Sequence, residues 1–275
     1  MWNFWRTRTK TWTNKKIAFV SILVAASVAF VLIFTRIAPI AALPSFKLMA
    51  GGLPIKLTGY IFGPLIGAVT GALADIISFS ITPTYIHWWY TIAFALAGAI
   101  PGIIGYIMNR RWRKKAETDE KFEKTYNHPN FIVTLLILAS IFIAIFTFVF
   151  IQGDEVFSKQ KLITNKWIFL AISTSGILTM FVATIIFRFK MKPSIFNAII
   201  PIVAFSAILE LINTPLISLG DRAVWDMKDE FVTILTGHLL FSPIKIWGNM
   251  LIILLSYRVV SPLIYNKTGN GWVEE

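Results

Sequence analysis

The chain has 275 residues, of which 56% are hydrophobic and only 15% are charged, and its mean hydropathy is +0.69. This composition excludes an ordinary soluble domain and predicts an integral membrane protein. The formal net charge of +12 does not indicate a nucleic-acid-binding protein, because the basic residues lie in short segments between apolar runs. Cysteine is absent, which excludes disulfides and Cys-ligated metal sites.

The apolar runs predict an all-α fold, a polytopic bundle of transmembrane helices, because a backbone inside lipid must satisfy its own hydrogen bonds. The first run is longer than the apolar core of a signal peptide, so we expect an uncleaved helix. In chain order, the eight predicted membrane segments are Ile17–Phe34, Leu53–Phe62, Leu65–Phe79, His87–Met108, Ile132–Ile151, Trp167–Phe187, Ile195–Ser218 and Leu239–Ile264.

Basic clusters predict the orientation of the chain, since Lys and Arg are enriched in cytoplasmic loops. If the basic amino terminus is cytoplasmic, the clusters at 110–115 and 188–192 should be cytoplasmic too. This requires two crossings, or a re-entrant pair with none, between Leu53 and Phe79, so we divide that region into two short helices at Gly63. We therefore expect a multi-pass protein of the cell membrane with both termini cytoplasmic.

A charged segment without apolar periodicity divides the chain into two lobes. The expected parts are a basic cytoplasmic tail (1–16), four core helices (17–108), a charged cytoplasmic linker (109–131), an inserted transmembrane hairpin (132–194), and the last two core helices with a cytoplasmic tail (195–275).

Small residues recur at four-residue spacing in two of the predicted helices. Gly63, Gly67 and Gly71 form one such face, and Ala25 and Ala29 form an A-x-x-x-A face in the first helix. Small residues let helices in lipid approach closely. We expect the glycine face to pack inside the protein, and the alanine face either to pack internally or to dock a partner membrane protein.

Ionisable residues inside predicted spans are candidate site residues, because a charge is costly there. They are Lys56, Asp75, Glu210 and Lys245. Glu210 and Lys245 would form a structural ion pair or contact a ligand, and the sequence leaves both open. Asn213 shares a helix face with Glu210, and a carboxylate beside a carboxamide suits a heterocycle that carries N–H donors and an acceptor.

Aromatic residues open the fourth predicted helix at the outer boundary of the membrane. Trp88, Trp89 and Tyr90 would form an interfacial belt or would stack on a planar ligand. Neither His128 nor His238 has a metal-ligating companion at helical spacing, so no metal or other cofactor is expected.

The order of these features resembles the substrate-binding component (S-component) of energy-coupling factor (ECF) transporters, most closely the folate-type branch. The resemblance rests on Ala25-x-x-x-Ala29, on the Leu-Pro-Ile, Phe-Gly-Pro and Gly-x-x-x-Gly-Ala-x-x-Asp motifs within Phe46–Ile77, and on Asn213-Thr214 followed by Lys245. It covers about 17–108 and 195–264, and leaves out the linker and the two helices between them.

The resemblance implies a six-helix S-component core with two additional helices inserted between the fourth and fifth core helices. It implies an outward-facing vitamin site formed by the short second and third helices and the loop before them. It also implies that the alanine face docks the coupling transmembrane subunit, which works with two ATPase subunits. This chain would then bind a solute and hydrolyse nothing, and it lacks a P-loop motif.

The resulting expectation is a membrane subunit that captures folate or a related pterin from outside for ATP-driven uptake. Alternatives are an S-component for another vitamin, such as riboflavin, and a self-contained secondary transporter. An intramembrane protease would need a base beside Ser175, which the sequence does not supply nearby. The pterin ring would suit Glu210, Asn213, Trp88, Trp89 and Tyr90, its acidic tail would suit Arg36, Lys47 or Arg222, and Lys245 is a further candidate.

Overall fold

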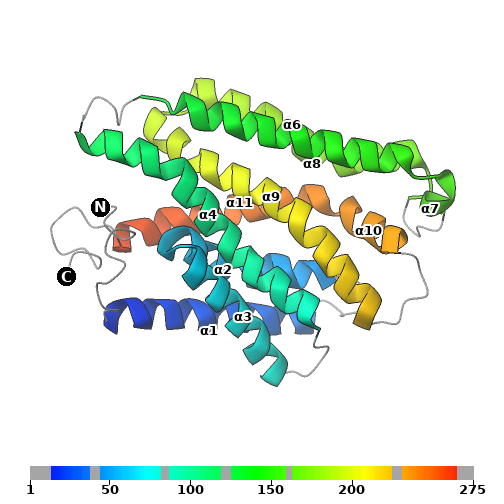
Figure 1. Ribbon diagram of the computed structural model, residues 1–275, viewed down its shortest axis with the longest axis horizontal. Helices are drawn as coiled ribbons and strands as arrows, with labels where there is room; N and C mark the ends of the chain where they lie inside the picture. Colours follow the sequence, from blue (N-terminus) through cyan, green and yellow to red (C-terminus); the bar gives the residue numbers. More distant parts are fainter. Residues whose placement is uncertain are drawn as a thin grey trace.

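The computed structural model describes residues 14–37, 44–81, 87–118, 125–158, 163–224 and 231–264. Within these ranges every regular element is an α-helix (Figure 1). The helices are α1 (Asn14–Ile37), α2 (Pro44–Phe62), α3 (Pro64–Ile81), α4 (Trp88–Thr118), α6 (His128–Ile151), α7 (Asp154–Ser158), α8 (Lys166–Lys190), α9 (Pro193–Val224), α10 (Phe231–Leu240) and α11 (Ser242–Ile264).

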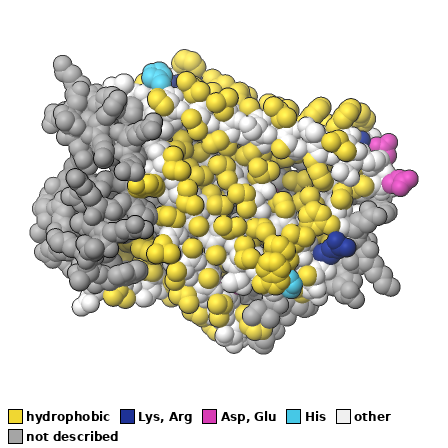
Figure 2. All heavy atoms as spheres, viewed as in Figure 1, with side chains coloured by type: hydrophobic (Ala, Val, Ile, Leu, Met, Phe, Trp, Pro, Cys, Tyr) yellow, Lys and Arg dark blue, Asp and Glu magenta, His cyan; other side chains and the backbone are white. Residues whose placement is uncertain are grey.

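The visible surface of the described residues is mainly hydrophobic (Figure 2). Figure 2 shows hydrophobic side chains across most of the described part of the visible face, with few charged side chains among them. Among the described residues, five helices are long and apolar enough to cross a membrane, or six if α10 and α11 form one bent span. The chain is therefore all-helical and consistent with a multi-pass membrane protein, as the composition predicts.

Each of the eight predicted segments overlaps a helix, but three expectations about helix length and continuity were wrong. α3 has 18 residues and is long enough to span, so it is not a half-length helix. α2 begins at Pro44 rather than Leu53 and continues through Pro54, which neighbouring helices make tolerable in a membrane protein.

The last predicted helix is broken instead of continuous. α10 and α11 meet at Phe241 with a bend of 52°. Pro243 lies just inside α11, where its lack of an N–H suits a helix start and would interrupt a continuous helix. The beginning of the charged linker is helical, because α4 continues to Thr118.

Helix ends alternate between the two ends of the molecule (Figure 1). α1 begins at the left of the view, and α4, α8 and α11 end there, while α4 and α8 begin at the right. The basic clusters 110–115 and 188–192 belong to the ends of α4 and α8. They therefore lie at the same end as the beginning of α1, the arrangement that the charge pattern predicts.

Glycines bring α2, α3 and α4 into backbone contact. A Cβ added at Gly98 of α4 would lie 1.9 Å from the carbonyl oxygen of Gly67 in α3, and one added at Gly59 of α2 would lie 1.8 Å from that of Gly98. The turn between α2 and α3 uses Gly63 at φ 102°, a conformation that side chains disfavour. The prediction that this glycine face packs inside the protein is confirmed.

α6 and α8 form a hairpin that lies along one side of the bundle, at the top of Figure 1. Asn127 and Asn165 cap the first turns of the two helices by accepting backbone N–H bonds. Lys166 donates to the carbonyl oxygens of Phe150 and Gln152, at 3.0 and 2.6 Å, at the carboxyl end of α6. These contacts tie the end of α6 to the beginning of α8.

Candidate functional site

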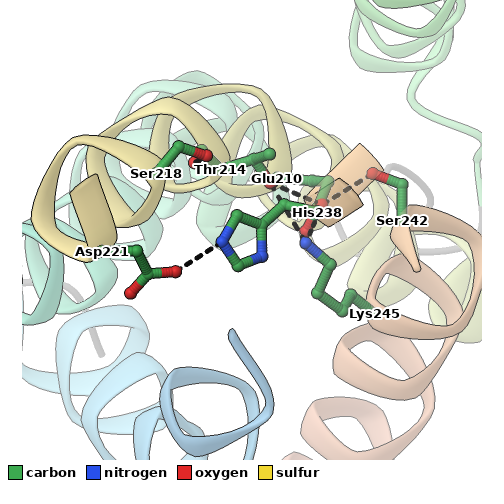
Figure 3. Close-up of polar contacts among 7 residues, drawn as sticks. All are labelled: Glu210, Thr214, Ser218, Asp221, His238, Ser242 and Lys245. Atoms are coloured by element: carbon green, nitrogen blue, oxygen red, sulfur yellow. Dashed lines mark hydrogen bonds and ion pairs between the residues drawn. The ribbon is translucent and has the colours of Figure 1, made fainter. Parts of the chain in front are cut away.

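Two rows of buried polar side chains face each other between α9 and the α10–α11 pair (Figure 3). In each row the residues are three or four apart, the spacing that keeps side chains on one face of a helix. We call this set the polar seam, and it consists of Glu210, Thr214, Ser218 and Asp221 on α9, His238 on α10, and Ser242, Lys245 and Asn249 on α11.

Glu210 is the centre of one part of the seam, which also contains Thr214, Ser242 and Lys245. Its Oε1 atom lies 2.5 Å from Lys245 Nζ and accepts hydrogen bonds from Thr214 Oγ1 at 2.7 Å and Ser242 Oγ at 2.6 Å (Figure 3). The carboxylate also lies at the amino terminus of α11, where the helix dipole favours negative charge. The Glu210–Lys245 ion pair considered from the sequence is therefore present. Two hydroxyl donors and the amino terminus of α11 stabilise the negative charge of Glu210.

Asp221 is the centre of the other part of the seam. Tyr90 Oη donates to Asp221 Oδ1, and His238 Nε2 lies 2.6 Å from Asp221 Oδ2. Thr91, next to Tyr90, donates to Asp75 Oδ2 of α3 at 2.6 Å. These bonds connect α4 with α9 and α10, and α3 with α4.

The seam also reaches α2. Lys56 Nζ donates to Asn249 Oδ1 at 2.5 Å, and the Lys56 side chain is 2% exposed. Lys56 was a candidate from its position alone, and the structure adds Asn249 as its partner.

Asn213 carries an unused hydrogen-bonding atom. Its side chain is 6% exposed, and its Oδ1 atom has no hydrogen-bond partner in the described part of the chain. Since nearly all buried polar groups in folded proteins are paired, an unpaired acceptor beside the seam is a place where a ligand N–H or O–H could bind.

The remaining predicted site residues separate into surface and interior groups. Trp88 is 56% exposed and stacks on Trp89 with ring centroids 3.8 Å apart, which suits a membrane-interface belt. Arg222 is exposed in the last turn of α9, while Tyr90 points into the bundle at Asp221. The side chains of Arg36 and Lys47 lie outside the described residues.

An open apolar groove of about 550 Å³ lies between α1 and α3. Its lining includes Ala25, Ala29, Leu73 and Ile77, and both alanines are exposed. The alanine face is therefore open instead of packed internally. The groove contains none of the predicted ligand-binding residues, so it is not the outward-facing site expected from the second and third helices and the loop before them.

Sequence analysis missed Asp221, His238, Ser242 and Asn249 as members of one site. Asp221 lies outside the predicted spans, because the predicted span ends at Ser218 whereas α9 continues to Val224. The sequence gives His238 no metal-ligating companion and places it far along the chain from Ser175, and the described residues contain no group of three potential metal-binding side chains. The signal that could have revealed them is the three-and-four spacing of polar residues within two apolar helices.

Comparison of the chain with protein-family models, curated proteins and solved structures found no match.

Proposed function

We propose that this chain is the solute-binding membrane subunit of an ECF-type transporter, and that it captures folate or a related pterin for uptake driven by two partner ATPase subunits. It would lie in the cell membrane with both termini in the cytoplasm. The chain itself would bind the solute and hydrolyse nothing.

The observation that carries this proposal is the polar seam with the unpaired Asn213 Oδ1 beside it. Buried charges are expensive in a membrane protein and are concentrated where solutes or ions bind. A pterin offers adjacent N–H donors and acceptors, which complement the Asn213 carboxamide and the Glu210 carboxylate. Tyr90 adds an aromatic ring near Asp221.

The groove between α1 and α3 supports the second part of the proposal, docking to a coupling transmembrane subunit. It is open, apolar and lined in part by Ala25 and Ala29, whose small side chains permit close approach of another helix. The groove and the seam use different residues, so a partner and a solute would not compete for the same atoms.

The direct test is to purify the chain in detergent and to identify any co-purifying small molecule by mass spectrometry and ultraviolet absorbance. Titration with folate and with riboflavin should then give saturable binding of folate. Replacing Asn213 by Leu should weaken folate binding about tenfold, the loss expected for one hydrogen bond.

Ser206→Ala is the matched control, because it also alters a buried, unpartnered polar side chain on α9. It should leave folate affinity unchanged. Binding of riboflavin with no response to folate would contradict the folate assignment, and a purified chain that binds neither would contradict the vitamin class tested.

A self-contained secondary transporter is the second candidate, favoured by the break between α10 and α11 beside the buried Asp221–His238 pair. Interrupted helices with ionisable side chains occur at the coupling-ion sites of such proteins. Uptake into liposomes that contain this chain alone, driven by a proton gradient without ATPase subunits, would favour this candidate over the ECF type.

A further inference from the structure

A second buried ammonium group lies close to the Glu210–Lys245 pair. Lys56 on α2 is 2% exposed and has the Asn249 carboxamide as its hydrogen-bond partner. In the described part of the chain, no carboxylate lies within ion-pair distance of Lys56. One of the three N–H donors of this ammonium group is therefore used on a neutral acceptor.

The charges around Lys56 do not balance. Lys56 lies within electrostatic range of both Glu210 and Lys245. The single carboxylate of this group already bonds Lys245, Thr214 and Ser242. With Lys56 protonated, two ammonium groups and one carboxylate would leave a net charge of +1 in a buried site, and a neutral amide offsets little of the cost of burying an ammonium group.

Lys56 extends toward the beginning of its own helix. A Cβ added at Gly52, one turn earlier in α2, would lie 3.3 Å from Lys56 Cε and 3.4 Å from Nζ. The beginning of α2 lies at the end of the bundle where α4 begins and α9 ends, the expected outer end (Figure 1). The ammonium group is thus displaced toward the side from which a solute would arrive.

We propose that the Lys56–Asn249 pair binds an acidic group of the solute. The solute then carries a carboxylate in addition to an N–H donor for the unpaired Oδ1 atom of Asn213. This inference rests on the proposed function and assigns the acid to a lysine inside the bundle instead of the mouth residues Arg36, Lys47 and Arg222. It favours folate over riboflavin within the vitamin class, because riboflavin has no carboxylate.

The test uses Lys56→Met, which keeps an unbranched side chain only one atom shorter and removes the charge. The probes are folate and 6-hydroxymethylpterin, which has the pterin ring without the carboxylates. The variant should lose at least about tenfold in folate affinity, the loss of a charge-assisted hydrogen bond, and should bind 6-hydroxymethylpterin as the original chain does. Its thermal unfolding midpoint without ligand should rise, because an unbalanced buried charge is gone.

Two further variants make the result specific. Ser206→Ala should change neither the affinities nor the midpoint. Lys245→Met removes the lysine that is paired with a carboxylate, and its midpoint should fall where that of Lys56→Met rises.

Several outcomes would overturn the inference. Unchanged folate affinity in Lys56→Met, equal losses for both pterins, a lower unfolding midpoint, or failure of this variant to fold would each make Lys56 a structural residue. If the original chain binds neither pterin, the folate proposal fails. In that case the unfolding midpoint of Lys56→Met alone tests whether Lys56 carries an unbalanced charge. A rise would support a site for another acid, and a fall or no change would overturn the inference.

Discussion

Two regions of this bundle hold their helices together by opposite means. At the contact between α3 and α4, Gly67 and Gly98 bring two backbones together, and a single methyl group would collide with a carbonyl oxygen. Between α9 and the α10–α11 pair, buried side chains with charges and hydroxyl groups fill the interface. The first contact depends on the absence of side chains, and the second on their chemistry.

This difference separates a contact that serves helix packing from an interface whose polar groups could also bind a ligand. Lipid offers little hydrophobic drive for helix association, so close packing of small residues is the ordinary way to stabilise such a bundle. A polar interface costs more to build and is vulnerable to the loss of any one partner. Its presence on α9 and α11 is therefore consistent with the proposed role in solute binding.

The largest expected effect comes from breaking the charged interface at its centre. Lys245→Met would leave Glu210 with two hydroxyl donors and no cation at 2.5 Å. Loss of one member of a buried ion pair typically costs about 3–5 kcal/mol. Equilibrium unfolding in detergent should show a decrease of this size in the free energy of unfolding. A decrease below about 1 kcal/mol would show that the interface tolerates the loss.

The glycine contact should respond to added volume instead of lost charge. Gly98→Ala places a methyl group 1.9 Å from the Gly67 carbonyl oxygen, so α3 and α4 must separate. Overpacking of this kind typically costs about 1–3 kcal/mol. The same unfolding measurement checks it.

Gly153→Ala is the matched control for this substitution, because nothing lies within 4 Å of a Cβ added there. Its free energy of unfolding should change by less than about 0.5 kcal/mol. Equal effects of the two glycine substitutions would mean that close approach of α3 and α4 is not what Gly98 provides.

The smallest expected effect is at the Asp221 end of the polar seam. Tyr90→Phe removes the hydroxyl that donates to Asp221 and leaves the His238 contact in place. Hydrogen bonds between membrane helices are typically worth about 0.6 kcal/mol and at most about 1.7. Ser140→Ala, which removes an exposed hydroxyl bonded within its own helix, should change stability less than Tyr90→Phe does.

Most of the fold could be predicted from the sequence, because long apolar runs have few alternatives to helices in lipid. Helix boundaries were harder to predict from the sequence where a proline is present. α2 continues through Pro54, whereas α10 and α11 separate next to Pro243, and only the surrounding packing decides which of the two happens.

The site could be predicted only in part. Glu210 and Lys245 were identifiable because each is a charge within an apolar run, but their pairing needs the relative placement of α9 and α11. Asp221 was missed because the end of a helix is the least predictable part of it. The charge imbalance at Lys56 could not be inferred at all, since it depends on side chains from α2, α9 and α11 meeting in space.

The hairpin of α6 and α8 has a consequence for how the molecule sits in a bilayer. It lies on the opposite side of the bundle from α1, so a protein bound along α1 would leave the hairpin in contact with annular lipid (Figure 1). α6 has 24 residues and is about 36 Å long at about 1.5 Å per residue, more than the roughly 30 Å of a hydrocarbon core. Because Lys166 ties α6 to α8, we expect the two helices to tilt together to fit the hydrocarbon core.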